Sequence, residues 1–295
     1  MNERKIYRTK KVVGFFCMVV FLCLAILQYF KNKLSVPFEI AMVVLFCAAV
    51  FFIAGSVNPS KSRIKKINKK ALITAVITLF AMIATVLAGV YLFDDRRYYL
   101  VSMLIILETM IPFAVMFESR GPKTREIVVI AVMCALAVTG RAAFFMVPQF
   151  KPMLAVVIIT GIALGGETGF LTGAVSAFVS NMFYGQGSWT PWQMFAMGVV
   201  GLISGMVFSK IKTNRIFMSV YGFFAAFAVY GLIMNASYVL TYQEHPNIKM
   251  FIATIANGIP FDAIHGGATA LFMWMLAPPM LEKLNRIKDK YGLME

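Results

Sequence analysis

The chain has 295 residues, of which 60% are hydrophobic and 14% charged, and its formal net charge is +15. Soluble domains carry about 25% charged residues, so this composition excludes an ordinary soluble protein. With a mean hydropathy of +0.79, it predicts an all-α membrane protein, because apolar runs in lipid satisfy their backbone hydrogen bonds by forming helices. In such a protein the excess of Lys and Arg is expected in the inner loops, at the surface of the lipid bilayer. Nucleic acid is therefore not expected as a partner.

Ten apolar segments are predicted as spans, since a run of about 20 residues is long enough to cross a bilayer. The first follows a basic start but ends in Gln28-Tyr29-Phe30, without a small-residue cleavage site, and is expected to remain as an anchor. The Gly165-Gly166-Glu167-Thr168 break predicts two short helices within 152–184. The ten segments are 12–30, 37–55, 71–92, 98–117, 126–146, 153–165, 168–184, 194–209, 216–240 and 250–277.

The distribution of basic residues predicts a multi-pass protein of the cell membrane with both termini cytoplasmic. With ten spans and an inner N-terminus, 21 of the 28 Lys and Arg residues fall in inner segments and 6 in outer loops. This asymmetry follows the positive-inside rule. Merging 152–184 into one span would move the last two basic segments outside, so ten spans are preferred.

A change in composition near residue 121 predicts two regions. Spans one to four are rich in Leu, Val, Ile and Phe and contain few polar residues, Glu108 being an exception. After Gly121-Pro122, polar and small residues enter both the spans and the outer loops. We therefore expect an accessory region of about four helices in 1–121 and a six-helix functional core in 122–295.

No catalytic signature is present, so the chain is not expected to be an enzyme and no cofactor is expected. The sequence contains no GxSxG, HExxH or P-loop motif. Two histidines exclude a multi-histidine metal site. Without a P-loop, any ATP-driven role requires a separate ATPase chain.

The outer face of the core carries the candidate substrate-binding residues. The loop 184–193 combines aromatic rings with amides, which suits a flat polar organic ligand, because binding pockets pair apolar walls with a few oriented polar groups. The alternative is an aromatic belt at the membrane interface, and for Arg141 a side chain that snorkels to the outer surface. The candidates are Arg141, Gln149, Tyr184, Gln186, Trp189, Trp192, Gln193 and Tyr238.

The last span contains a buried polar pair. Pro260 is expected to kink this helix. Asp262 and His265 are three residues apart and share one helical face. A carboxylate at this depth must face the bundle interior and find a partner, so we expect a structural pair, with a proton relay as the alternative.

Small residues recur at four-residue spacing, which lets helices approach closely. In the first core helix Ala131 and Ala135 form one such pair. The glycines at this spacing are interpreted as internal packing positions: Gly161, Gly165, Gly169, Gly173, Gly201 and Gly205.

Residues 122–295 resemble the substrate-binding (S) components of energy-coupling-factor (ECF) vitamin transporters, whereas the first 120 residues do not resemble the family core. The loop before Gln193 is the most specific part of the resemblance. The motifs that carry it are Ala131-x-x-x-Ala135, Gly140-Arg141-Ala142-Ala143-Phe144-Phe145, Phe150-Lys151-Pro152, the glycines from Gly161 to Gly173, Tyr184 through Gln193, and Pro260-Phe261-Asp262-x-x-His265.

The resemblance implies a six-helix subunit that binds a vitamin at its outer face. It implies partners as well: a transmembrane coupling subunit, which would contact Ala131 and Ala135, and two cytoplasmic ATPases. Ligand contacts would come mainly from residues 184–193. Among vitamins, the aromatic, amide-rich loop is most similar to the cobalamin group.

Two other functions stay open on the sequence alone. A stand-alone proton-coupled carrier would use Asp262 and His265, and would transport without partner proteins. A membrane sensor or assembly factor would use spans one to four as its partner surface, and would bind no small molecule.

Overall fold

The computed structural model describes the core of the chain as an all-helical protein, with no strand among the described residues. The predicted spans 12–30 and 37–55 lie outside those residues. The structure describes 77–78, 80–81, 84–85, 88, 98–119, 121–122, 124–209, 211, 214–243 and 246–292. The elements are α4 (Tyr98–Ser119), α5 (Thr124–Ala143), α6 (Met153–Leu164), α7 (Gly166–Tyr184), α8 (Thr190–Phe208), α9 (Arg215–Phe224), the π-helix η1 (Ala225–Tyr230), α10 (Gly231–Tyr242) and α11 (Ile248–Tyr291).

Three helical segments in the described part are long and apolar enough to cross a membrane. They are Thr124–Ala143, Thr190–Phe208 and the continuous helix Arg215–Tyr242. Their lengths and composition confirm that the chain is a helical membrane protein. The total of ten spans and the cytoplasmic placement of both termini stay predictions.

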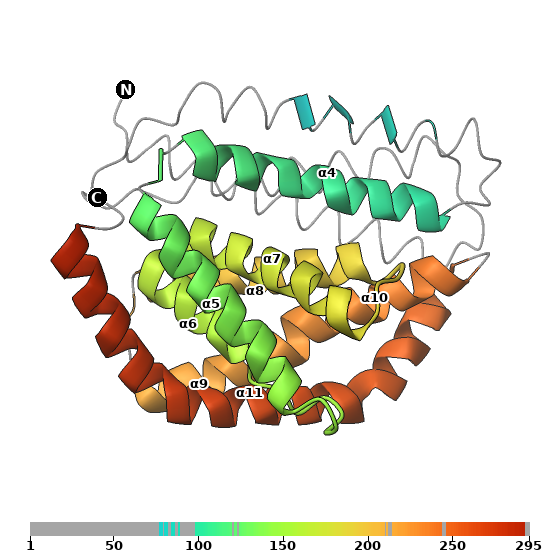
Figure 1. The fold of residues 1–295 in the computed structure, drawn as a ribbon. Coiled ribbons are helices and arrows are strands. Elements are labelled where there is room, and N and C mark those ends of the chain that lie inside the picture. The colour runs from blue at the N-terminus through green and yellow to red at the C-terminus, as the bar shows by residue number, and fades with distance from the viewer. Residues whose placement is uncertain are drawn as a thin grey trace, which may run out of the picture. The chain divides into compact units, whose positions relative to one another are not determined.

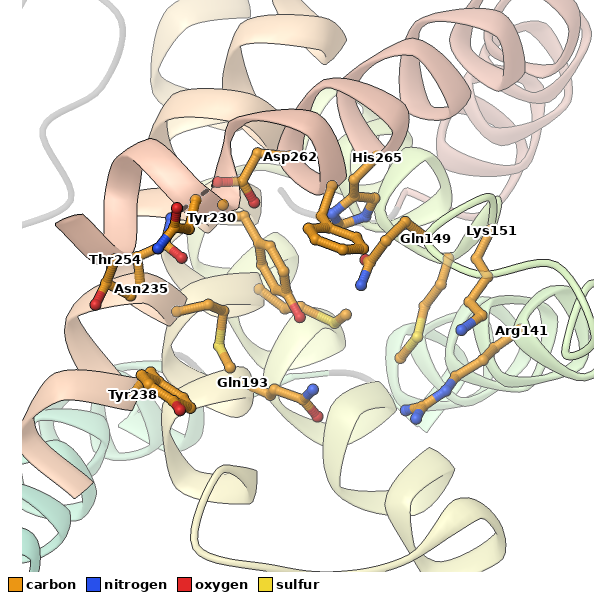
Figure 2. A pocket seen from close by; sticks show the side chains of 16 residues that line it. Arg141, Gln149, Lys151, Gln193, Tyr230, Asn235, Tyr238, Thr254, Asp262 and His265 are labelled. Carbon is orange, nitrogen blue, oxygen red and sulfur yellow. Dashed lines mark hydrogen bonds between the residues drawn. The ribbon is translucent and has the colours of Figure 1, made fainter. Parts of the chain in front are cut away.

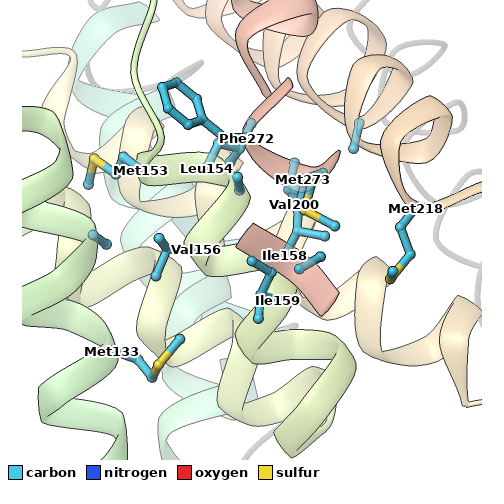
Figure 3. Close-up of a cluster of buried hydrophobic side chains, with 14 of the residues drawn as sticks. Met133, Met153, Leu154, Val156, Ile158, Ile159, Val200, Met218, Phe272 and Met273 are labelled. Atoms are coloured by element: carbon cyan, nitrogen blue, oxygen red, sulfur yellow. The ribbon is translucent and has the colours of Figure 1, made fainter. Parts of the chain in front are cut away.

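The short helix α6 is the centre of the core. It is apolar around its whole circumference, as expected for a helix with no solvent-facing side. Leu154, Ile158 and Ile159 are fully buried, and they pack with Val200 of α8 and Met273 of α11 (Figure 3). Four described helices, α5, α7, α8 and α11, pack around it.

Glycines let α6, α7 and α8 approach one another to backbone contact. A Cβ on Gly169 would lie 2.6 Å from the Gly201 carbonyl oxygen and 2.7 Å from Cα of Gly161. A Cβ on Gly205 would meet the backbone of Gly166. The close contacts confirm the packing interpretation for the other glycines of this spacing, but not for Gly165, where an added Cβ would meet nothing within 4 Å. The predicted break also occurs: Gly165, with φ of 96°, separates α6 from α7, and only glycine adopts this conformation readily.

Two irregular helices complete the core. The helix formed by α9, η1 and α10 contains a π-helical segment of six residues, a feature that often marks functional sites. The helix α11 runs for 44 residues, continues past the predicted span, and contains Pro260, Pro278 and Pro279. Figure 1 shows that α11 is strongly curved, as expected where proline removes a backbone donor.

The helix α4 packs against α7, α8 and α10, within the compact unit Asn68–Glu295 that holds all the described residues (Figure 1). Its Glu108 accepts a hydrogen bond from the Thr85 hydroxyl at 2.6 Å. The predicted division of the chain near residue 121 stays a prediction.

Gly201→Ala is expected to destabilise the core, because the added methyl group would meet the backbone of Gly169. Overpacking of this kind costs about 1–3 kcal/mol. The control is Gly267→Ala on α11, where no atom lies within 4 Å of the added carbon. Thermal unfolding in detergent should show a lower midpoint for Gly201→Ala and an unchanged or slightly higher one for Gly267→Ala. Equal midpoints would contradict the backbone contact between α7 and α8.

Candidate functional site

A cavity of about 620 Å³ lies within the core, between α5, α6, α8, η1, α10 and α11 (Figure 2). Four of the eight predicted substrate-binding residues line it: Arg141, Gln149, Gln193 and Tyr238. The predicted polar pair lines it as well. The remaining lining residues are Lys151, Met153, Met197, Tyr230, Met234, Asn235, Thr254, Asn257, Gly258 and Phe261, beside Asp262 and His265.

Arg141, near the end of α5, is held against α7 by neutral partners. Its guanidinium donates hydrogen bonds to the Ser180 hydroxyl and, at 2.8 Å, to the Asn181 side-chain oxygen. It also lies over the Tyr184 ring, 5.1 Å from the ring centroid, in a cation–π contact. These contacts fix the cation at the cavity wall and argue against a side chain that merely snorkels to the surface.

Asn181 connects Arg141 to α8. It is fully buried, and its amide nitrogen donates to the Thr190 hydroxyl at 3.1 Å and to the Gln193 side-chain oxygen at 2.8 Å. Because buried amides are stable only when hydrogen-bonded, the network orients Gln193, with its amide at the cavity. One buried residue therefore positions two predicted ligand contacts.

The loop between α5 and α6 brings Gln149 and Lys151 to the cavity. Gln149 has a positive φ of 57°, an uncommon conformation for a residue other than glycine. Partial burial lowers the pKa of the Lys151 ammonium, and the positive charge of Arg141 lowers it further. The two cations thus lie near each other at one side of the cavity, as Figure 2 shows.

The other side of the cavity carries a carboxylate. Asp262 of α11 accepts a hydrogen bond from the Asn235 amide of α10 at 2.8 Å. The close approach of α11 to α10 depends on Gly231, where a Cβ would meet the Asp262 carboxyl group. Asp262 is therefore paired with an amide of α10, and the expected partner His265 contacts a different residue.

His265 and Tyr230 form the inner wall between the two sides. The His265 ring meets Tyr230 edge to face, with 4.9 Å between centroids. Tyr230 is the last residue of η1. With Met197, Met234 and Phe261, these rings give the cavity apolar walls between its polar groups, as expected for a small-molecule site.

The other four predicted contacts lie elsewhere. Tyr184 stacks on Phe145, 4.7 Å between centroids, and supports Arg141 from outside the cavity. Gln186 is exposed and donates to the Phe178 carbonyl at 3.3 Å. Trp189 is 40% exposed, whereas Trp192 is buried in the core.

Several cavity residues were not predicted: Lys151, Tyr230, Asn235, Thr254 and Asn257. On α11, the spacing of Thr254, Asn257, Asp262 and His265 follows one helical face, and this periodicity is a signal that the sequence contains. For Tyr230 and Asn235, which lie on either side of the end of a π-helix, regular α-helical spacing gives no such signal.

An apolar groove of about 700 Å³ lies along α5 and α7, apart from the cavity. The predicted interface residues Ala131 and Ala135 both line it, and both are exposed. Val175, Val179 and Phe183 of α7 form the other side. Small exposed residues beside larger apolar ones leave room for another helix to approach closely.

Asn181→Ala is expected to lower stability, because it removes three hydrogen bonds of a fully buried side chain and leaves half-buried groups of Arg141 and Gln193 without these partners. An unsatisfied buried polar group costs about 1–3 kcal/mol. The control is Gln186→Ala, an exposed amide, which should change stability by less than about 0.5 kcal/mol. Thermal unfolding in detergent measures both variants, and an equal small effect would show that the network contributes little.

One protein family matches the core of the chain. Its profile, described as "ECF-type riboflavin transporter, S component", matches residues 122–283. A UPF0397 protein of Aliivibrio fischeri strain MJ11 is 36% identical over 97 residues, which are 31% of this chain and 52% of that protein. A UPF0397 protein of Vibrio atlanticus strain LGP32 is 31% identical over 147 residues, 48% of this chain and 76% of that protein.

The chain thus spans about half the length of the Aliivibrio relatives that it matches. No solved structure matches it. The family profile covers more than half of the chain and describes a transporter subunit. The chain therefore belongs to the ECF-type riboflavin transporter S-component family.

Proposed function

We propose that the core of this chain is the substrate-specific subunit of an ECF-type importer and binds a vitamin in the cavity around Arg141 and Asp262. The observation that carries the proposal is the cavity itself, where polar groups from α5, the loop after it, α8, η1, α10 and α11 converge between apolar walls. Its volume of about 620 Å³ falls within the range of about 300–1,000 Å³ that is usual for small-molecule sites.

For the ligand, the family description names riboflavin, and a compound of that size suits the cavity volume. The tyrosines Tyr230 and Tyr238 can stack on a flat ring system, while Gln149 and Gln193 supply amide donors and acceptors. Cobalamin, the prediction from the sequence, is a much bulkier compound. It would need the cavity to widen, so we propose a flavin-sized heteroaromatic ligand ahead of it.

For coupling, we propose that the groove beside Ala131 and Ala135 docks on the transmembrane coupling subunit. Two ATPase chains, which the resemblance implies, would drive that subunit, and the missing P-loop in this sequence is consistent with separate ATPases. The groove has an apolar lining and is separate from the cavity, so docking and ligand binding use different surfaces. Under the predicted orientation, the cavity is loaded from outside the cell before the ATPases reorient the subunit.

One observation favours a second function, a stand-alone proton-coupled carrier. Asp262 and His265 both face the same cavity, where a proton and a ligand could bind together. Such a carrier would transport in vesicles that contain this chain alone, in response to a pH gradient. The importer would transport only with its coupling subunit, the ATPases and ATP.

Calorimetry of the purified chain against a vitamin panel, with riboflavin and cobalamin included, tests the ligand site. Met234→Trp should abolish binding of the compound that the wild type binds, because the larger side chain fills the cavity. The control is Met206→Trp, at a position 57% exposed on α8, which should retain affinity. A ligand that binds equally to both variants occupies another site.

Ala131→Leu tests the docking surface. It should lower ligand uptake in the assembled importer by about tenfold or more, equivalent to about 1.4 kcal/mol, because the longer side chain fills the groove. Ligand affinity of the isolated chain should not change. The control is Ala253→Leu, at an exposed position of α11 outside the groove and the cavity. Equal uptake by the two variants would remove the groove from the proposal.

A further inference from the structure

The cavity separates its charges by sign. Arg141 and Lys151 lie together on one side of Tyr230, and Asp262 lies with Asn235 on the other (Figure 2). Ionisable groups within membrane-spanning helices are costly unless paired, so the charges of Arg141 on α5 and Asp262 on α11 require an explanation.

At the cationic side, the contacts leave room for an anion. Arg141 is held by a hydroxyl, an amide oxygen and an aromatic ring, all of them neutral. Among the described residues, no carboxylate forms an ion pair with Arg141 or Lys151. A guanidinium bound through one nitrogen, NH1, keeps other donors for a ligand oxyanion, the partner that arginine binds most strongly.

At the acidic side, the carboxylate lacks a cation. The hydrogen bond from Asn235 reaches one oxygen of Asp262, Oδ2. In the described part of the chain, no Lys or Arg forms an ion pair with this carboxylate. Thr254 and Asn257 line the same part of α11 and add neutral hydrogen-bonding groups. A protonated ligand nitrogen would supply the missing charge.

Two simpler explanations fit less well. A structural ion pair would bring Asp262 to Arg141 or Lys151, but the opposite charges lie apart, on either side of Tyr230 (Figure 2). A neutral ligand would leave these three half-buried charges without counter-charges, and even partial burial of an unpaired charge is unfavourable.

We propose that the cavity selects an amphoteric heteroaromatic ligand, with a cationic nitrogen at Asp262 and an anionic group at Arg141 and Lys151. This inference rests on the proposed function. The rings of Tyr230 and Tyr238 contact the flat part between them. The charge pattern thus narrows the substrate class beyond the flavin-sized compound inferred above, since riboflavin itself carries no charge at neutral pH.

Four probes that differ in charge test this inference by calorimetry on the full chain. They are riboflavin (neutral), riboflavin 5′-phosphate (anionic), thiamine (cationic) and thiamine monophosphate (both charges). We expect thiamine monophosphate to bind at least about tenfold more tightly than each of the other three.

Two charge-neutralising variants test which charged group of the ligand each side of the cavity binds. Asp262→Asn should weaken the cationic and doubly charged probes and leave riboflavin 5′-phosphate unchanged. Lys151→Gln should weaken the two phosphorylated probes and leave thiamine unchanged. The matched controls, Glu282→Gln and Lys283→Gln, change exposed charges at the far end of α11 and should affect no probe. Thermal unfolding confirms that every variant is folded.

The outcomes separate this inference from the proposed function. Riboflavin binding as tightly as thiamine monophosphate, with no effect of Asp262→Asn, would overturn the inference and leave the vitamin-binding subunit in place. Tight binding of riboflavin 5′-phosphate alone would also overturn it, because only the cationic side would then be used. If folded wild-type protein binds none of the four probes, the inference fails, whereas the proposed function fails only if the wider vitamin panel gives no binding either.

Discussion

The close approach of α6, α7 and α8 is the constraint on which the rest of the structure depends. Their glycines bring the backbones into contact, and this contact fixes α7 beside α8. Asn181 of α7 can then reach Gln193 of α8 while it holds Arg141 of α5. Because packing and the polar network share the same helices, a loss of packing would displace the cationic side of the cavity as well.

The acidic side of the cavity depends on irregular helices instead. The π-helical segment η1 ends at Tyr230, and Gly231, which follows it, admits the Asp262 carboxyl group beside α10. The cavity therefore joins a tightly packed wall to one built from a π-helix and a proline-containing helix. Unpaired charges on both walls cost stability in the ligand-free protein, and a ligand with complementary charges would offset that cost.

Local sequence signals predicted the packing better than the site. The break at Gly165 and the glycine contacts follow from residue type and spacing, and both are present. The site residues depend on which helix faces meet. Trp192 is buried in the core, although the composition of its loop predicted a ligand contact. Lys151 lines the cavity, although nothing in its local sequence distinguishes it from an ordinary loop lysine. The resemblance to S components gave the family, but it did not indicate the charge separation within the cavity.

The most direct test of the central claim, that the core holds a vitamin-sized ligand in this cavity, is to identify what the protein carries from its own cell. Wild-type protein is purified in mild detergent and denatured, and the released small molecules are identified and quantified by mass spectrometry. We expect one heteroaromatic compound in near-stoichiometric amount, absent when the cavity is filled by a larger side chain. Release of the same compound in equal amount from the cavity-filled protein would show that the ligand binds outside this cavity.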